Sequence, residues 1–547
     1  MSSGGGFRSR AKKTSTGTGR DKRQQRGEQS SRGTRQEQRG GRARGGRAGG
    51  PARQDRGPVV SHSRDAGRGR GREQRRGPKQ SGGGLSSRQQ AAALREHEVD
   101  AARIVALQTI MAVRRDDAFA NLVLPNLLRE HSLTGRDAAF ATELAYCSLR
   151  ARGVLDAIIT RAAARPLKDI TPELLAVLEL GTYQLLFTRV EAHAALDTSV
   201  RMARGLGHER ATGFINGTLR TISRSDREHW LDEAGPSMGI ARTAFRAQHP
   251  TWIARSFATA LGIDSEEHNA ELEEALAADS QRPIVHLVAK PGQISAEELA
   301  LISGGEEGAY SPYAVYLPEG DPAECPPVKE KLAAVQDEGS QLIARALTEA
   351  PLEGTDTGRW LDLCAGPGGK AALIAAIAGI DGATVDAVEP AAHRAKLVRG
   401  ATEGLPVRVH QADGRSPGLR SGYDRILVDA PCSGLGSLRR RPEARWTKTE
   451  SDIAELTQLQ AELLESAIGL VREGGVIVYS TCSPDVRETR EIVDQALERH
   501  PELEEVDARQ LVAPMADVGE HLSVQMWPHR HGTDAMFCAV VRKKSVS

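Results

Sequence analysis

The chain has 547 residues, enough for several domains, and its net charge of +1 hides two opposite parts. Residues 1–89 carry 24 of the 73 Lys and Arg but 6 of the 72 Asp and Glu, which gives a net charge of +18 there and −17 in the remainder. Six cysteines without a CxxC pair or zinc-type Cys/His spacing exclude a disulfide scaffold and predict no metal. The N-terminus lacks the apolar core of a secretory signal, and no apolar run approaches the roughly 18 residues of a membrane span, so we expect a cytoplasmic protein with no membrane contact.

Residues 1–92 form a low-complexity segment with stretches such as RGGRARGGRAGG and GRGRGREQRRGPKQ. Because Phe7 is its one aromatic residue, the segment cannot bury enough apolar surface to offset its ordering entropy, and we predict a disordered basic tail. Its arginines suit sequence-independent contact with RNA phosphates. The alternative is a solubilising tail with no specific partner.

Residues 93–228 carry apolar residues at helical spacing, for example in DAARIVALQTIMAVRRD and TPELLAVLELGTYQLLFTRV. There is little strand signal, so this region is predicted to be an all-helical domain. Residues 229–334 mix helical stretches with the short strand candidates RPIVHLVAK, AYSPY and AVYLP, which predicts a small α+β subdomain.

Residues 335–547 alternate between strands and helices, in the order RWLDLC, GGKAALIAAIAG, TVDAVEP, AAHRAKLVRGATEG, VRVHQAD, YDRILVDAP, a long helix and GGVIVYSTC. Such alternation predicts a Rossmann-like α/β domain with a mostly parallel, doubly wound sheet.

The first strand of this domain ends in the loop LCAGPGGK, which holds Gly366, Gly368 and Gly369 before a helix begins near Lys370. Glycines let a backbone approach a ligand closely, and a helix N-terminus offers free N–H groups. Phosphate and dinucleotide sites use similar turns, but this loop is neither GxxxxGK[ST] nor GxGxxG.

Acidic residues at the ends of the next strands indicate which ligand the loop serves. Glu389 lies about 20 residues past the loop, where a carboxylate can accept both hydroxyls of an adenosine ribose. Asp413, at the end of the third strand, can accept the adenine amino group. Together they predict a nucleoside pocket without a phosphate requirement; the alternative is a purely structural role for the glycines and Glu389.

Two cysteines, Cys432 in DAPCSGLG and Cys482 in YSTCSP, follow the fourth and fifth strands on the same side of the sheet. A lone cysteine there is more often a small buried apolar residue than a nucleophile, and a disulfide is a second alternative. Two cysteines at adjacent strand ends, one of them close to Asp429, favour covalent catalysis.

Methylation of an unreactive pyrimidine carbon needs a thiolate of this kind. Thiolate addition at C6 makes C5 nucleophilic, an acid near N3 stabilises the charge on the ring, and loss of the C5 proton then eliminates the thiol. Asp429 is placed to act at N3. One cysteine adds to the ring and the other assists release, and the spacing alone does not say which does which.

The motifs LDLCAGPGGK, DAPCSGLG followed by RRRPEARW, YSTCSP and PHRHGTDAMFCAVVRK resemble those of the RNA cytosine-C5 methyltransferases. The resemblance implies that Cys482 is the nucleophile, that Cys432 assists release and that Asp429 contacts cytosine. Ala535 stands where that family often has glycine. The resemblance also implies an S-adenosylmethionine site formed by Cys364, Ala365, Gly366, Pro367, Gly368, Gly369, Lys370, Glu389, Asp413 and Asp429.

The helical segments RDAAFATELAYCSLR, PELLAVLELGTYQLLF and ATGFINGTLRTISR resemble the NusB-like RNA-binding domain of RsmB-type 16S rRNA methyltransferases. This implies small-subunit rRNA as the substrate, and we expect a monomer that does not bind DNA. Two alternatives remain: a tRNA cytosine-C5 methyltransferase, and a non-catalytic RNA-binding ribosome assembly factor.

A run of basic residues follows the first cysteine motif, with Arg439, Arg440, Arg441 and Arg445. We predict that these arginines hold the RNA backbone near the site; the alternative is a solvated basic loop. Trp446 can stack on a base or belong to the core.

Overall fold

The computed structural model describes residues 86–116, 118–263 and 269–545. The tail predicted for residues 1–92 lies outside the described residues up to residue 85. Helix α1 (Ser87–Glu96) begins inside the segment predicted as tail. The sequence RQQAAALRE is rich in good helix formers, and Ser86 and Gln89 form a reciprocal capping box at the helix start.

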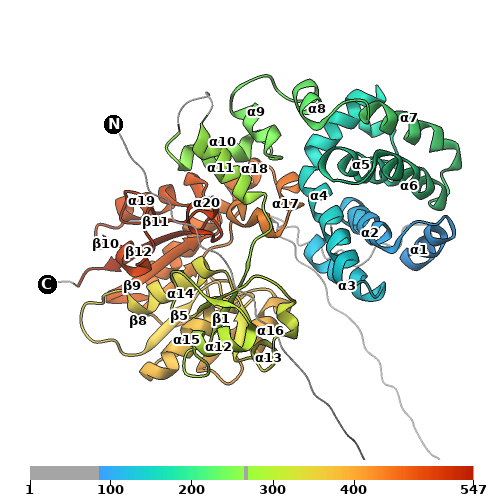
Figure 1. The fold of residues 1–547 in the computed structure, drawn as a ribbon. Coiled ribbons are helices and arrows are strands. Elements are labelled where there is room, and N and C mark those ends of the chain that lie inside the picture. The colour runs from blue at the N-terminus through green and yellow to red at the C-terminus, as the bar shows by residue number, and fades with distance from the viewer. Residues whose placement is uncertain (1–85, 117, 264–268, 546–547) are drawn as a thin grey trace, which may run out of the picture. The chain divides into compact units, whose positions relative to one another are not determined.

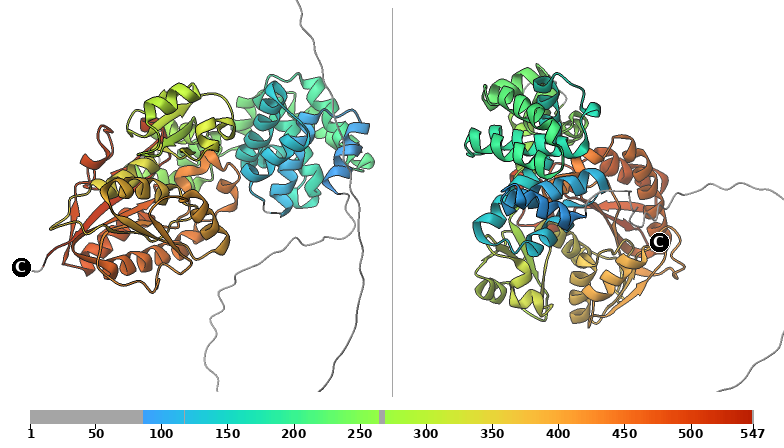
Figure 2. Two further views of the ribbon diagram at one scale, coloured as in Figure 1. Left: turned by 90° about the horizontal axis from the view of Figure 1, so that it is seen from below. Right: turned by 90° about the vertical axis from the view of Figure 1, so that its right-hand side faces the viewer.

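The N-terminal third of the described chain is a helical bundle, as predicted. It contains α1, α2 (Ala101–Asp116), α3 (Ala120–Glu130), α4 (Gly135–Ala163), α5 (Pro172–Phe187), α6 (Ala192–Gly205), α7 (Thr212–Ile222) and α8 (Arg227–Ala234). Both views of Figure 2 show the blue-to-green helices gathered into this bundle.

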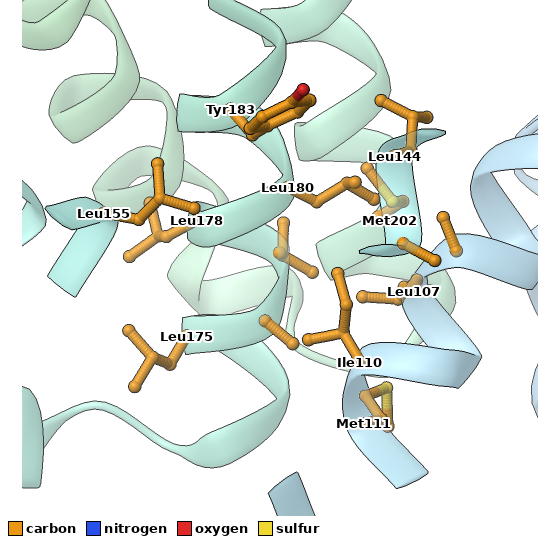
Figure 3. Packing of buried hydrophobic residues seen from close by; sticks show 14 of the residues in the cluster. Leu107, Ile110, Met111, Leu144, Leu155, Leu175, Leu178, Leu180, Tyr183 and Met202 are labelled. Carbon is orange, nitrogen blue, oxygen red and sulfur yellow. The ribbon is translucent and has the colours of Figure 1, made fainter. Parts of the chain in front are cut away.

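Helix α5 forms the centre of the bundle. Every residue from Leu174 to Gln184 is buried, as expected for a helix that is apolar on all sides. Leu180 of α5 lies among side chains from the surrounding helices, including Ile110 of α2 and Met202 of α6 (Figure 3).

A smaller α+β region follows. It contains α9 (Gly239–Arg246), α10 (Thr251–Ala260), α11 (Ala270–Asp279), β1 (Val285–Ala289), α12 (Ala296–Ser303), β2 (Glu306–Glu307), β3 (Ala314–Leu317), α13 (Pro326–Lys329) and β4 (Ala333–Val335). The four strands form an antiparallel sheet in the order β2-β3-β1-β4.

The prediction of a strand in AYSPY is wrong. The backbone N–H groups of Tyr310 and Ser311 donate to the carboxylate of Glu338 instead of to a neighbouring strand. The strand signal of the tyrosines was therefore overridden by a buried acid 28 residues further along the chain.

The C-terminal domain is built on one large sheet. Its strands are β5 (Arg359–Asp362), β6 (Thr384–Val388), β7 (Val407–His410), β8 (Tyr423–Asp429), β9 (Val471–Thr481), β10 (Leu503–Val506), β11 (Val524–Gln525) and β12 (Phe537–Lys543). The order along the sheet is β10-β12-β9-β8-β5-β6-β7, with β11 paired to β12. Strands β5 to β9 are parallel, and β12 joins β9 in the antiparallel sense.

Helices cover both faces of this sheet (Figure 1). They are α14 (Glu338–Glu349), α15 (Gly369–Asp381), α16 (Ala392–Ala401), α18 (Ser451–Leu470) and α19 (Arg490–Arg499). Successive strand residues alternate between two cores: Val478 packs with residues of α14 and α15, and Tyr479 packs with residues of α18 and α19. This arrangement is the predicted doubly wound α/β domain.

The chain reverses its direction of travel across the sheet at β5. From β5 it continues through β6 and β7 on one side, and then crosses to β8 and β9 on the other. In open α/β sheets the ligand site lies outside the carboxyl ends of the strands at such a switch point. The glycine loop and both cysteine motifs follow carboxyl ends of strands at this position.

Candidate active site

The glycine loop connects Asp362 at the end of β5 to the start of α15 at Gly369. Gly368 has a φ of +116°, a conformation that other residues rarely adopt. A Cβ atom on Gly366 would collide with the carboxylate of Glu389 and with the guanidinium of Arg394. The loop therefore requires glycine at both positions and leaves its backbone open to a ligand.

Glu389 follows β6 and is 3% exposed. Its Oε1 atom accepts a hydrogen bond from the backbone N–H of Ala391 at 2.9 Å, which fixes the carboxylate beside the glycine loop. Arg394 on α16 lies 3.5 Å from the other oxygen and also donates to the carbonyl of Gly366. The sequence interpretation missed Arg394, whose only local signal is its position one helical turn into α16.

Three buried or half-buried carboxyl groups converge at this edge of the sheet. Asp362, Glu389 and Asp429 lie at the ends of β5, β6 and β8. Burial, together with the charges of Asp429 and Glu389, raises the pKa of Asp362 to about 7. Such a site favours a cationic ligand, and S-adenosylmethionine carries a sulfonium and an ammonium group. The open glycine loop and the acid cluster thus fit the methyl donor predicted from the sequence.

The raised pKa of Asp362 predicts a pH dependence of stability. Because the folded-state pKa lies above the ordinary value of 3.8, the contribution of this group is fully present at low pH and is lost as the pH rises toward about 7. The free energy of unfolding of Asp362→Asn, measured relative to that of the wild type, should therefore rise by about 2–3 kcal/mol between pH 5 and pH 8. Thermal unfolding of the donor-free protein across this range measures the change.

The exposed Asp381 at the end of α15 provides the matched control. Asp381→Asn changes the same net charge, and the offset between its unfolding temperature and that of the wild type should stay constant with pH. A constant offset for Asp362→Asn as well would show that Asp362 does not titrate between pH 5 and pH 8 in the folded protein, and would contradict the prediction.

Asp413 differs from the other acids predicted for the donor site. It comes after β7, its carboxylate is 45% exposed, and Arg415 binds both of its oxygens. Glu462 of α18 pairs with the same arginine at 3.0 Å. The guanidinium lowers the pKa of Asp413 and engages the atoms expected to accept the adenine amino group. Asp413 can therefore bind the donor only if Arg415 shares the Asp413 carboxylate with the donor or moves away from it.

The two cysteines of the strand-end motifs face each other. The Sγ atoms of Cys432 and Cys482 are 3.4 Å apart, and both thiols are free. The Cys432 thiol lowers the pKa of Cys482 by a hydrogen bond, and the cations of Lys370 and Arg441 act in the same direction. That hydrogen bond and burial raise the pKa of Cys432 well above its ordinary value. Charge thus favours a thiolate at Cys482 and a thiol at Cys432.

Asp429 and Lys370 lie beside the cysteine pair. The Nζ of Lys370 donates to Oδ2 of Asp429 at 2.8 Å, and the hydroxyl of Ser480 donates to Oδ1 at 2.9 Å. Lys370 is the last residue of the glycine-loop motif, so one ammonium group connects the predicted donor loop to the predicted catalytic residues.

Glu488 holds the two cysteine loops together. It is fully buried, and one oxygen accepts hydrogen bonds from the backbone N–H of Ser433 at 2.8 Å and from Gln460 of α18 at 3.1 Å. The other oxygen accepts from the Ser433 hydroxyl. Glu488 thereby fixes the residue next to Cys432 from a position six residues past Cys482. Sequence reasoning missed it, because a single acid in a polar loop carries no distinguishing pattern.

The prediction that Arg439, Arg440 and Arg445 hold RNA is wrong. Arg439 and Arg440 pair with Asp534 at 2.7 and 2.8 Å, and Arg440 also pairs with Asp337 at 2.7 Å. Arg445 is completely buried against Asp279 of α11. These ion pairs hold the short helix η4 (Leu435–Arg440) and the loop after it in place, since a buried charge is retained only with a partner.

Arg441 is different from its neighbours in the run. Its guanidinium lies close to Gly434 and within electrostatic reach of Cys482, and it has no ion-pair partner among the described residues. Trp446 is half-buried and packs against α4: its indole N–H donates to the carbonyl of Arg150 at 2.8 Å, and its ring closes over Gly153. Of the basic run, Arg441 alone remains a candidate for contact with a substrate.

Across residues 86–116, 118–263 and 269–545, no group of three His, Cys, Asp or Glu side chains is arranged to hold a metal ion. In the same part of the chain, none of the helices combines the length and apolar character needed to cross a membrane.

A glycine loop and strand-end acids at the switch point of a doubly wound sheet, next to a facing pair of cysteines, define a Rossmann-like methyltransferase. Residues 349–542 match the family of 16S rRNA methyltransferases RsmB/F, and residues 100–224 match the NusB family. The chain belongs to the RsmB/F family and carries a NusB domain in its N-terminal helical region. It is therefore an S-adenosylmethionine-dependent RNA methyltransferase.

Individual relatives cover nearly the whole described chain. A putative methyltransferase of Mycobacterium tuberculosis is 55% identical over 454 residues, which is 82% of this chain and 98% of that protein. The probable ribosomal RNA small subunit methyltransferase B of Bacillus subtilis is 30% identical over 81% of this chain and 98% of its own length. The crystal structure of PH0851 shares the fold, with a TM-score of 0.67 at 22% identity over 80% of this chain and 98% of its own.

Proposed function

We propose that this protein methylates C5 of a cytosine in 16S rRNA through a covalent adduct with Cys482. The observation that carries the proposal is the cysteine pair, with Sγ atoms 3.4 Å apart, beside Asp429 and Lys370. A methyltransferase that acts on a nucleophilic oxygen or nitrogen has no use for a thiolate at this position. A pyrimidine C5 needs one, because it becomes nucleophilic only after addition at C6.

Cys482 acts first. Its thiolate adds to C6 of the cytosine, the C5–C6 double bond opens, and the charge that develops on the ring is neutralised by a proton held between Asp429 and N3. The hydrogen bonds from Ser480 and Lys370 orient the Asp429 carboxyl group for this contact. S-adenosylmethionine, when bound, supplies the methyl group from its sulfonium centre.

Cys432 acts in the second half of the reaction. The C5 proton passes to a solvent water acting as the base, the electrons of the C5–H bond form the C5–C6 double bond again, and the bond between Cys482 and C6 breaks with both of its electrons returning to the sulfur. Cys432 lies next to that sulfur and carries a proton in the resting site, so it can stabilise the departing thiolate. Glu488 keeps Cys432 in position by binding the adjacent Ser433.

The choice of 16S rRNA rests on the relatives. The family is one of 16S rRNA methyltransferases, and the relative from Serratia proteamaculans, 32% identical over 77% of this chain and 94% of its own, is named ribosomal RNA small subunit methyltransferase B. The alternatives are tRNA as substrate and an assembly role without turnover. The acidic residues and the two cysteines needed for the reaction are all present, which argues against an assembly role without turnover.

The test is an analysis of the product. The purified protein is incubated with S-adenosylmethionine and an in vitro transcript of either 16S rRNA or a tRNA pool, and the digested nucleosides are identified by mass spectrometry. We expect 5-methylcytidine from the 16S transcript, at a single position by bisulfite mapping. Methylation of tRNA alone, a different methylated nucleoside or no turnover would each overturn the proposal.

A further inference from the structure

The two cysteines of the active site lie close enough to be oxidised as a pair. Their Sγ atoms are 3.4 Å apart, and a disulfide bond needs about 2.0 Å, so a displacement of about 1.4 Å joins them. All six cysteines of the chain fall within the described residues and are free, and among those residues no other two sulfur atoms are within hydrogen-bonding distance. Cys432 and Cys482 are therefore the pair positioned for a bond within the chain.

The backbone holds the two thiols at this distance. Just before the cysteines, the N–H of Ala430 donates to the carbonyl of Ser480 at 2.8 Å, across the parallel pair β8 and β9. Just after them, the hydroxyl oxygens of Ser433 and Ser483 are 3.2 Å apart and share a hydrogen bond. Because the two loops are joined on both sides of the cysteines, each thiol meets the other at a high effective concentration.

The charges around the pair give the two thiols different roles in an oxidation. The thiolate is the form that attacks a peroxide. The hydrogen bond from Cys432 and the cations of Lys370 and Arg441 lower the pKa of Cys482. The same hydrogen bond, burial and the negative charge of Glu488 raise the pKa of Cys432, which keeps its proton. Both cysteines are half-buried, so a molecule as small as hydrogen peroxide can reach them.

We propose that Cys482 and Cys432 form a reversible disulfide when the protein meets hydrogen peroxide, and that this bond switches methylation off. The Cys482 thiolate attacks one peroxide oxygen, the O–O bond breaks, and the departing hydroxide takes a proton from solvent, which leaves a sulfenic acid and water. Cys432 then gives its proton to solvent and attacks the sulfur of Cys482. The S–S bond forms, the S–O bond breaks, and the hydroxide leaves as a second water after protonation. The two thiols lose two electrons, and the peroxide gains them.

The disulfide has two consequences for the protein. It occupies the sulfur that adds to C6, so the oxidised form does not methylate, whereas the glycine loop and Glu389 are unchanged and still bind the donor. It also consumes the sulfenic acid before more peroxide converts it irreversibly to a sulfinic acid. Cys432 thereby protects the nucleophile in addition to assisting product release, and a dithiol reductant restores both thiols.

The experiment exposes the full-length protein, without RNA, to increasing amounts of hydrogen peroxide, removes the peroxide with catalase and alkylates the remaining thiols. Intact mass spectrometry and a non-reducing tryptic digest then identify the products. We expect the loss of two hydrogen atoms and a cross-link between the peptides 426–439 and 473–487. Four of the six cysteines should still be alkylated. Methylation should fall in proportion to the cross-linked fraction, and dithiothreitol should return it to within about twofold of the untreated protein.

Two variants separate the switch from general oxidation of cysteines. Cys364→Ala removes another half-buried cysteine at a strand end but keeps the pair, so its cross-link should form as in the wild type. Cys432→Ala leaves the sulfur of Cys482 without a partner. Its peptide 473–487 should instead gain two oxygen atoms that dithiothreitol does not remove.

Several results would overturn the proposal. They are a cross-link to any other cysteine, a disulfide between two chains, addition of oxygen to wild-type Cys482 without a cross-link, and full methylation by the cross-linked protein. The inference rests on the proposed function only for the loss of methylation. Because the cross-link is read by mass, it can form in a protein that yields no 5-methylcytidine, so failure of the switch is distinguishable from failure of the proposed function.

Discussion

Replacing Cys482 with alanine is expected to lower the rate of RNA methylation by at least about 10⁴-fold. Without the sulfur no group can add to C6, and C5 of an intact cytosine is not nucleophilic enough to accept a methyl group. Asp429, Lys370 and the glycine loop remain in place, so binding of S-adenosylmethionine should stay within about twofold of the wild type. Single-turnover methylation assays and calorimetric titration of the donor measure the two quantities separately.

Cys364 supplies the matched control. Like Cys432 and Cys482 it is a half-buried cysteine at a strand end, but burial and the charges of Asp362, Asp429 and Glu389 raise its pKa well above the ordinary value. Because Cys364 lies in the predicted donor loop, any loss in Cys364→Ala should fall on donor binding, and methylation at saturating S-adenosylmethionine should stay within about tenfold of the wild type. If Cys482→Ala retained comparable activity, the covalent mechanism would be wrong for this sulfur, whatever the product.

Much of the site could be predicted because its residues are fixed by local pattern. Glu389 and Cys482 directly follow apolar strands, Asp429 is the last residue of one, and alternation with helices makes those strands parallel. The carboxyl ends of parallel strands meet at one edge of a sheet, so the sequence alone predicts that these side chains converge. Gly368 is equally local, since the turn itself requires its φ of +116°, whereas Gly366 is required by the approach of Glu389 and Arg394.

The arginine run shows what local pattern could not supply. RRRPEAR is typical of a solvated basic segment, but Arg439 meets Asp534, which lies 95 residues further along the chain. Arg445 meets Asp279, which precedes it by 166 residues. Whether an arginine is free or paired depends on such distant acids, and neither spacing nor periodicity reports them. The prediction of phosphate contacts for Arg439, Arg440 and Arg445 therefore failed on ion pairs that the sequence does not report.

The roles of the two cysteines also depend on tertiary structure. From the sequence, Cys432 and Cys482 are equivalent strand-end residues, and only family resemblance separates them. In the fold, the cations of Lys370 and Arg441 act on Cys482, whereas the carboxylate of Glu488 acts on Cys432. This asymmetry of charge supports a thiolate at Cys482 and a protonated thiol at Cys432. We therefore expect opposite results from replacing the two cysteines.

Cys432→Ala is expected to accumulate a covalent protein–RNA complex in place of product. Cys482 keeps its position beside Lys370 and Asp429, so addition to C6 still occurs, but the group that assists departure of the sulfur is gone. A complex that survives denaturation should appear as a shifted band in SDS gels and should disappear after RNase treatment. Turnover should fall by about 10²-fold or more, the usual contribution of a proton-transferring group.

Two further variants separate trapping from nonspecific crosslinking. The double variant Cys432→Ala with Cys482→Ala should form no complex, because the attacking atom is absent. Ser433→Ala should leave Cys432 present but loosen its loop from Glu488, and we expect slower release with only a weak shifted band. If Cys482→Ala alone trapped RNA, the attacking sulfur would be that of Cys432, and the cations near Cys482 would then serve to stabilise a leaving thiolate.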